Sequence, residues 1–160
     1  MEKIILKPEV QDVRELIRKA VDNMRSSFDE RQQKIVVKLP AEPAVARVDA
    51  NQLRSALENL LENASHYTWA NKTITVSCRT LRQTVKISVQ DQGVGIDPAD
   101  FSKLFQKFSR LPNPLSMEVS GTGLGLYWAS RIVQLHAGII TIKSAPKRGS
   151  TFTVELPRAV

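Results

Sequence analysis

Two asparagines stand one helical turn apart within a helical pattern of apolar residues. In the segment ENLLENASHYT, residues 58–68, Asn59 and Asn63 are followed closely by His66 and Tyr67. Asparagine is a poor helix former, because its amide competes for nearby backbone groups. Its amide oxygen, however, is a suitable neutral ligand for a hard cation, and its NH₂ group can donate to a phosphate. This pair could therefore bind a metal–phosphate group.

The two asparagines share one edge of the predicted helix. At about 100° of rotation per residue, the apolar side chains form a single core-facing stripe. That stripe consists of Leu53, Ala56, Leu57, Leu60, Leu61 and Ala64. Asn59, Asn63 and His66 fall on a narrow edge beside it, and Tyr67 falls between that edge and the stripe. The edge is equally consistent with a solvated polar flank and with a row of ligand-binding side chains.

Two glycine-containing segments could complete such a site. In QDQGVGID, Asp91 ends a predicted strand, and Gly93 and Gly95 permit a tight turn. A plain turn is the simpler interpretation of this segment taken alone. A carboxylate beside a Gly-x-Gly turn can nevertheless accept a hydrogen bond from an exocyclic amine. The missing side chains would then allow a flat base to approach the backbone.

In the second segment, SGTGLGL, the residues Gly121, Gly123 and Gly125 lead into a predicted helix N-terminus. The backbone N–H groups and the dipole at a helix N-terminus favour phosphate binding. Neither segment fits a dinucleotide-binding fingerprint, because Pro98 and Leu126 occupy the positions of the third glycine. Neither contains the Gly-Lys-Ser/Thr of a P-loop.

An aromatic segment, FSKLFQKFSR, separates the two glycine segments. Phe101, Phe105 and Phe108 have helical spacing, which indicates core packing more often than ligand contact. Lys107 and Arg110 could reach phosphates from the mouth of a flexible lid. The next residues, 110–121, contain two prolines and predict a loop.

These segments require a mixed fold to position them. We expect helices at residues 10–28, at about 50–66 after an N-cap at Asp49, and at 124–137. The predicted strands are 34–39, 45–48, 73–78, 84–89, 139–144 and 150–156. Adjacent strands are expected to pair as hairpins. This favours an α+β fold, a two-layer α/β sandwich with a mixed, mostly antiparallel sheet covered on one face by about three helices, over a doubly wound parallel fold.

Composition and charge set broader limits. The 160 residues, 42% hydrophobic and 24% charged, fit a single globular domain over residues 1–160. There is no apolar run of the roughly 18 residues that a membrane span needs, and the N-terminus does not resemble a secretion signal. Cys78 is the only cysteine, which excludes an internal disulfide and a multi-cysteine zinc site. These features predict a cytoplasmic domain. The net charge of +7 suits nucleic acid, a polyphosphate ligand or an acidic protein, and does not decide between them.

Taken in order, Asn-x-x-x-Asn, Asp-x-Gly-x-Gly, the Phe-rich segment and Gly-Thr-Gly-Leu-Gly-Leu resemble a known family. They are similar to the motifs of the ATP-binding catalytic domain of sensor histidine kinases, in the gyrase/chaperone/histidine kinase/MutL ATPase superfamily. The resemblance covers about residues 7–156. It implies a Bergerat fold that binds ATP and Mg²⁺ between the asparagine helix and a mobile lid at about residues 109–120.

The resemblance also implies a role for each motif residue. Asn59 and Asn63 would hold Mg²⁺ and the phosphates, and Arg110 and Lys107 would offset charge on the γ-phosphate. Asp91 would receive the adenine amino group, and Tyr67 would cover the base. The adenine pocket would be shaped by Gly93, Gly95, Ile96 and, through water, Ser150. The hinge of the lid on the phosphate side would be formed by Gly121, Thr122, Gly123, Leu124, Gly125 and Leu126.

One position departs from the family pattern. His66 stands where the family often has a lysine, and a histidine is only partly protonated at neutral pH. We therefore expect His66 to contact the nucleotide, and the affinity for nucleotide to weaken as pH rises through its titration.

The resemblance favours a kinase over a hydrolase. Relatives that hydrolyse ATP have a glutamate four residues before the second asparagine, where this chain has Asn59. Phosphoryl transfer depends chiefly on alignment and charge stabilisation, so the domain could still present ATP to an external nucleophile. Neither His66 nor His136 lies in a phosphoacceptor-like segment.

The expected partners are therefore a dimerisation/phosphoacceptor domain, usually in the same parent polypeptide, and a downstream response regulator. Contact with nucleic acid or a membrane is not expected. An anti-sigma-type serine kinase and a catalytically silent nucleotide-binding adaptor of the same fold are the alternatives.

Overall fold

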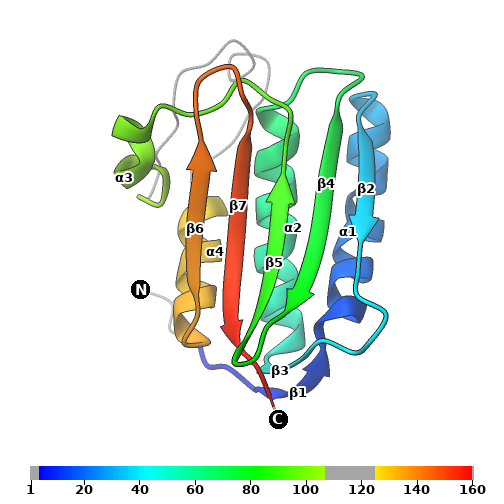
Figure 1. Ribbon diagram of the computed structural model, residues 1–160, viewed down its shortest axis with the longest axis vertical. Helices are drawn as coiled ribbons and strands as arrows, with labels where there is room; N and C mark the ends of the chain where they lie inside the picture. Colours follow the sequence, from blue (N-terminus) through cyan, green and yellow to red (C-terminus); the bar gives the residue numbers. More distant parts are fainter. Residues whose placement is uncertain (1–3, 107–124, 160) are drawn as a thin grey trace.

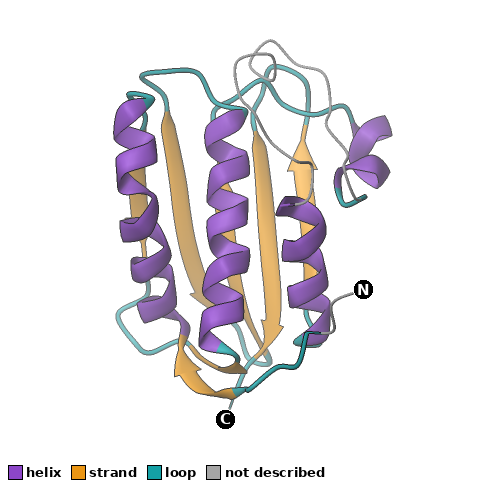
Figure 2. Ribbon diagram, turned by 180° about the vertical axis from the view of Figure 1, so that it is seen from behind, coloured by secondary structure: helices purple, strands orange, loops and turns teal. Residues whose placement is uncertain are grey.

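The computed structural model describes residues 4–106 and 125–159. In this part of the chain, three long helices pack against one face of a five-stranded sheet, and the other face is left open (Figures 1 and 2). The helices are α1 (Val13–Glu30), α2 (Ala50–His66) and α4 (Gly125–Leu135). The strands, in their order across the sheet, are β2 (Lys34–Lys38), β4 (Thr73–Thr80), β5 (Thr84–Gln90), β7 (Ser150–Pro157) and β6 (Ile139–Ser144).

The sheet is mixed and mostly antiparallel. Among the strands of the described ranges, β2 and β4 pair in parallel, whereas β4–β5, β5–β7 and β7–β6 are antiparallel. Alternate residues of the central strands are buried beneath the helices, as the alternating sequence pattern predicts. The predicted apolar stripe of α2, from Leu53 to Ala64, is buried at every one of its positions. The expected two-layer architecture and the three-helix cover are confirmed.

The N-terminus of α2 follows the predicted capping pattern. The side chain of Asp49 accepts a hydrogen bond from the backbone N–H of Gln52, 3.1 Å away, as an N-cap residue should. The helix ends at His66, and Tyr67 is its C-cap. The bounds of α2 therefore match the prediction.

The start of α1 was predicted wrongly. Residues Glu9–Asp12 form a short strand, β1, which pairs with β3 (Val45–Val48) in a separate two-stranded ribbon. Val10, expected on the core face of a helix, is 61% exposed. The side chain of Asp12 accepts from the backbone N–H of Arg14, and this cap starts the helix at Val13, three residues later than expected. The sequence pattern did not reveal this pairing because β1 and β3 are far apart in the chain.

A short irregular segment follows β5. It contains a 3₁₀ turn, η1 (Pro98–Asp100), and a single helical turn, α3 (Phe101–Leu104). Phe101 and Phe105 pack against the core, and the Phe105 ring meets Phe152 edge to face at 6.4 Å. The predicted packing role of these two aromatic residues is confirmed.

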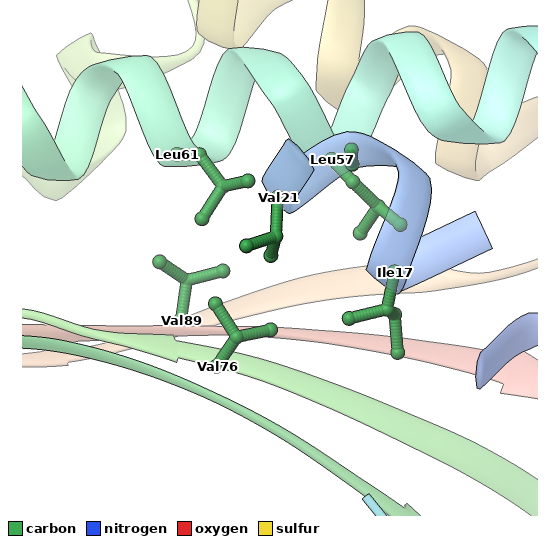
Figure 3. Close-up of a pocket in the computed structure, with 7 residues that line it drawn as sticks. Ile17, Val21, Leu57, Leu61, Val76 and Val89 are labelled. Carbon is green, nitrogen blue, oxygen red and sulfur yellow. The ribbon is translucent and has the colours of Figure 1, made fainter. Parts of the chain in front are cut away.

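A small apolar cavity remains in the core between α1, α2 and the sheet (Figure 3). Its volume is about 10 Å³, close to the minimum that could hold one water molecule. The lining side chains are Ile17, Ala20, Val21, Leu57, Leu61, Val76 and Val89. Because this lining is entirely apolar, we expect the cavity to be dry.

Across residues 4–106 and 125–159, no helix has the length and hydropathy of a membrane span.

Candidate functional site

One end of the sandwich gathers the predicted site residues (upper end in Figure 1). The C-terminal end of α2, the end of β5 and the hairpin between β6 and β7 lie there, and α4 starts lower down, beside Asn59 of α2. This topology brings segments that are far apart in the sequence to the same end of the sandwich. The backbone hydrogen bonds around Asp91 then determine how they fit together.

Asp91 is the centre of this arrangement. It is only 4% exposed, and its Oδ1 atom accepts hydrogen bonds from the backbone N–H groups of Gly93 (2.9 Å) and Ser150 (3.0 Å). Its Oδ2 atom is buried and has no hydrogen-bond partner among the described residues. A buried acceptor without a partner is unfavourable. A ligand N–H group placed there would remove that penalty.

Burial also changes the charge state of this carboxyl group. Desolvation raises the pKa of Asp91 to about 6, although the hydrogen bonds from Gly93 and Ser150 oppose the shift. The group is still mostly ionised at neutral pH, and its free oxygen is then an acceptor. Its environment therefore favours a ligand that donates a hydrogen bond.

Gly93 is required by close packing against the end of α2. A Cβ atom at this position would lie 1.8 Å from the carbonyl oxygen of Tyr67. The same carbonyl accepts a hydrogen bond from the backbone N–H of Val94, at 3.0 Å. The turn after β5 is thus fixed directly against the C-cap of the asparagine helix.

Gly95 and Gly149 shape the opposite wall. Gly95 has a φ of +73°, and a Cβ on it would lie 1.9 Å from the carbonyl oxygen of Ala145. Gly149 has a φ of +75°, and its Cβ would lie 2.3 Å from the carbonyl oxygen of Asp91. Both positions therefore exclude any residue with a side chain.

Ser144 is a residue of this site that the sequence analysis missed. Its Oγ atom accepts from the backbone N–H of Ile96 (2.8 Å), donates to the carbonyl of Gly149 (2.9 Å) and lies 2.6 Å from Oγ of Ser150. Ile96 itself is buried. The available signal was the hairpin register, because Ser144 and Ser150 are the pair that flanks the turn between β6 and β7.

The asparagine edge of α2 faces the start of α4. A Cβ on Gly125 would lie 3.6 Å from Oδ1 of Asn59, so the first residue of α4 is close to that side chain. Asn63, one turn further along, is half-buried, and its Nδ2 atom has no hydrogen-bond partner among the described residues. Leu126 follows Gly125 in the first turn of α4. The structure thus brings Asn59 of the predicted amide pair next to Gly125, the first residue of α4.

His66 has a partner within the chain. Its Nε2 atom lies 2.6 Å from Oε1 of Glu62, which also accepts from Nη2 of Arg31 at 3.2 Å. The hydrogen bond with His66 is the main cause that lowers the pKa of Glu62, and the charge of Arg31 adds to it, against the opposing effect of burial. A nucleotide would therefore have to compete with Glu62 for this imidazole.

A second missed residue, Gln33, fixes the end of α2 from the opposite side. Its Nε2 atom donates to the carbonyls of Ser65 (2.9 Å) and Thr68 (2.7 Å), and its Oε1 atom accepts from Oγ of Ser65 at 2.5 Å. Gln33 is 6% exposed. It lies in the turn after α1, where neither periodicity nor a motif indicated a role. Through these bonds it holds the chain on both sides of Tyr67.

The remaining predictions lie outside the described residues. These are the lid at about residues 109–120 and the residues Lys107, Phe108, Arg110, Gly121, Thr122, Gly123 and Leu124. Within residues 4–106 and 125–159, no group of three or more His, Cys, Asp or Glu side chains could hold a metal ion. The prediction that Asn59 and Asn63 hold Mg²⁺ stays a prediction.

The fold is one that solved histidine kinases share. The structure matches a mycobacterial sensor histidine kinase, MprB, with a TM-score of 0.82 at 23% identity, over 95% of this chain and 98% of that one. It matches the catalytic domain of the histidine kinase ThkA with a TM-score of 0.82 at 24% identity, over 95% and 98% of the two chains. These matches define the fold class and confirm the expected sandwich.

The sequence itself identifies the family. Residues 48–160 match the model of the histidine kinase-, DNA gyrase B-, and HSP90-like ATPases. The chain belongs to this family, and its domain is an ATP-binding domain. The predicted family resemblance is confirmed.

Two curated relatives are cyanobacterial kinases. The chain is 34% identical to the adaptive-response sensory kinase SasA of Synechococcus elongatus over 143 residues, which are 89% of this chain and 36% of that kinase. It is 39% identical to the circadian input-output histidine kinase CikA of the same species over 113 residues, 71% of this chain and 15% of that kinase. The chain thus spans about a third or less of these two relatives.

Proposed function

We propose that this chain is the ATP-binding catalytic domain of a two-component sensor histidine kinase. It binds Mg-ATP and presents the γ-phosphate to a histidine on a separate dimerisation/phosphoacceptor domain. The single observation that carries the proposal is the buried Oδ2 atom of Asp91, which has no partner among the described residues and lies where the turn after β5 meets the end of the asparagine helix.

Asp91 supports adenine as the base. Its free carboxylate oxygen accepts a hydrogen bond, and the exocyclic amine of adenine donates one. Guanine has a carbonyl oxygen at the equivalent ring position, and two acceptors facing each other repel. Gly93 and Gly95 let the turn pack against the carbonyl oxygens of Tyr67 and Ala145, which fixes the backbone beside Asp91.

The phosphate side is formed by α2 and α4. The amide oxygens of Asn59 and Asn63 fit Mg²⁺, which takes oxygen ligands and is commonly held by few protein groups together with substrate phosphates. When bound, Mg²⁺ neutralises charge on the phosphates. Helix α4 starts beside Asn59. The dipole and the backbone N–H groups at the N-terminus of a helix favour phosphate binding.

The carboxylates near the asparagine pair are engaged elsewhere. Glu58 accepts from Nδ2 of Asn23 at 2.7 Å, and Glu62 binds His66 and Arg31. The contacts of both carboxylates therefore hold them to neighbouring side chains of α1, α2 and the α1 C-cap. This supports transfer to an external nucleophile over rapid hydrolysis of ATP.

Both histidines of the chain are poor candidates for that nucleophile. His136 is 8% exposed, its Nδ1 atom is 2.8 Å from the carbonyl of Ile132, and its Nε2 atom accepts from the backbone N–H of Asp49 at 3.0 Å. The Nε2 atom of His66 is 2.6 Å from Oε1 of Glu62 and therefore already has a partner. The phosphoacceptor is therefore expected on another domain, usually in the same parent polypeptide and in the cytoplasm, where ATP is available.

A response regulator is the expected downstream partner. One solved neighbour, with a TM-score of 0.82 at 21% identity, is the histidine kinase ThkA in complex with the response regulator protein TrrA. The relatives SasA and CikA are themselves named as kinases. These relationships support a place for this domain in the same class of signalling system.

The test is a transfer assay with separated domains. The protein is mixed with Mg²⁺, γ-labelled ATP and an isolated dimerisation/histidine domain from a related kinase. The expected product is acid-labile label on the histidine domain and none on this chain. Acid-stable label on a partner serine would favour the serine-kinase alternative, and ATP binding without any transfer would favour a silent adaptor. Acid-labile label on this chain itself would contradict the proposal.

A further inference from the structure

In the described part of the chain, the helices cover one face of the sheet, and the opposite face carries hydroxyl and cationic side chains. In the described part of the chain this face is uncovered and forms the front of Figure 1. A groove of about 610 Å³ crosses it over strands β2, β4, β5, β7 and β6. None of the residues that form the groove takes part in the nucleotide site. The groove is therefore a separate surface of the domain.

A row of hydroxyl groups forms the floor of the groove. The strand register places Ser77 opposite Ser88, Ser88 opposite Thr153, and Thr153 opposite Thr141. Oγ of Ser88 and Oγ1 of Thr153 are 3.0 Å apart. These short polar side chains leave a shallow floor with hydrogen-bonding groups and no large apolar side chain.

Cations border this hydroxyl row on three sides. Lys38 of β2 is paired with Ser77 at one end of the row. Arg79 and Lys86 are paired with each other two residues further along their strands. Lys143 lies two residues from Thr141 along β6, in the opposite direction from the Arg79–Lys86 pair. With about 3.3 Å per residue along a strand, the two cation-bearing rows lie about 13 Å apart.

These positive charges are largely uncompensated. Glu155 is paired with Lys86, but its Oε2 atom is 3.9 Å from Nζ. The side chains of Lys38, Arg79 and Lys143 are exposed and form no ion pair or hydrogen bond within residues 4–106 and 125–159. The groove thus has three free cations around a floor of hydroxyl donors, a combination that is complementary to carboxylates.

We propose that this open face binds an acidic segment of a partner protein. Carboxylate side chains would form ion pairs with Lys38, Arg79 and Lys143 and accept hydrogen bonds from the hydroxyl row. Nucleic acid fits less well, because the groove lining has no aromatic side chain on which a base could stack. A membrane surface also fits less well, because hydroxyl groups occupy the centre of the face and its exposed apolar side chains, Val36 and Ile139, lie apart on the two outer strands.

The area of the open face limits how strongly it can bind a partner protein. Five strands at about 4.8 Å spacing span about 19 Å, so the area between the cation rows is roughly 250 Å². A stable interface buries about 800 Å² on each partner. The contact is therefore weak and transient, and it depends strongly on salt because exposed charges carry it.

The experiment compares two triple variants of equal net charge. One removes the free cations of the open face (Lys38→Gln, Arg79→Gln, Lys143→Gln). The control removes three exposed cations elsewhere (Lys19→Gln, Lys72→Gln, Arg131→Gln). The probe is a fluorescein-labelled 20-residue polyglutamate peptide, measured by anisotropy at 20 and 150 mM salt. Amide chemical shifts are recorded in parallel.

The expected result is about tenfold weaker polyglutamate binding for the open-face variant and less than a twofold change for the control. Amide shifts on binding should map to Ser77, Ser88 and Thr153. Equal losses in both triple variants, or shifts confined to the helices, would overturn the proposal. A single-stranded oligothymidylate or anionic vesicles that bind this face more tightly than polyglutamate would also overturn it.

Discussion

Asp91 and Ser150 bind each other through two hydrogen bonds. The backbone N–H of Asp91 donates to the carbonyl of Ser150 at 2.8 Å, and the backbone N–H of Ser150 donates to Oδ1 of Asp91 at 3.0 Å. This reciprocal pair joins the end of β5 to the start of β7 and holds the carboxyl group in one orientation. Oδ2, which has no partner within residues 4–106 and 125–159, is thereby fixed in position before any ligand binds.

Replacing Asp91 with asparagine should abolish tight ATP binding while the fold persists. Asparagine has nearly the same shape, and its Oδ1 atom can still accept from Gly93 and Ser150. Its NH₂ group would then face the adenine amine, donor against donor. We expect a loss of about 2–3 kcal/mol, or a 30- to 150-fold higher Kd, measured by isothermal titration calorimetry. An unchanged Kd for Asp91→Asn would contradict the role of Oδ2. Asp97→Asn, which changes an exposed carboxylate, is the matched control.

The same residue should make the nucleotide-free protein less stable as pH rises. Burial raises the folded-state pKa of Asp91 from 3.8 to about 6, so the folded protein holds this proton more tightly than the unfolded chain. The contribution of Asp91 to stability is therefore complete below about pH 4 and is lost as pH rises to about 6. Its size is about 1–3 kcal/mol. Other carboxylates, such as Glu62, act in the opposite direction because their pKa is lowered.

Urea unfolding between pH 4 and 7 can isolate this contribution. The difference in free energy of unfolding between wild type and Asp91→Asn removes the effects of the other groups. Wild type should lose stability relative to the variant over that pH range. A constant difference would show that burial does not raise the pKa of Asp91.

His66→Lys should make nucleotide affinity less dependent on pH between 6 and 8. Lysine carries a permanent charge in this range, whereas the charge of a histidine depends on pH. In wild type, Glu62 also competes with phosphate for the imidazole. We expect the variant to bind Mg-ATP more tightly than wild type at pH 8, and to differ less at pH 6. Asp91 is common to both proteins, so its effect cancels. Parallel affinity profiles would exclude a contact between His66 and the phosphates.

Much of the fold and part of the site could be predicted from local patterns. The bounds of α2, its Asp49 cap and its buried stripe followed from periodicity and capping chemistry, which act within a few residues. The β1–β3 ribbon and the Gln33 bonds could not be predicted, because they join residues more than 30 positions apart. The partner of His66, Glu62, lies one turn back on the same helix, but it also binds Arg31, the C-cap of α1, which is 31 positions away.

Filling the core cavity should stabilise the domain. Val76 and Val89 point from the sheet into the space beneath α1 and α2 (Figure 3). Val76→Ile adds one methylene there, which should raise the free energy of unfolding by about 0.5–1 kcal/mol. Val36→Ile adds the same group at a position that is 40% exposed and should change stability by less than about 0.5 kcal/mol. The urea midpoints of the two variants, each compared with wild type, measure both changes in stability. Destabilisation by Val76→Ile would mean that the cavity cannot accept the extra atom without strain.

Gln33→Leu should weaken both stability and nucleotide binding. The variant loses the hydrogen bonds to Ser65 and Thr68 and leaves their buried carbonyls without these donors. We expect destabilisation of about 2–3 kcal/mol. Because those bonds hold the chain on both sides of Tyr67, Kd for Mg-ATP should also rise several-fold under conditions where the variant remains folded. Gln33→Glu retains an acceptor for Ser65 but loses the donor and should behave similarly. Gln83→Ala, at an exposed position, should be neutral in both measurements. A destabilised Gln33→Leu protein with wild-type affinity would limit Gln33 to a role in folding.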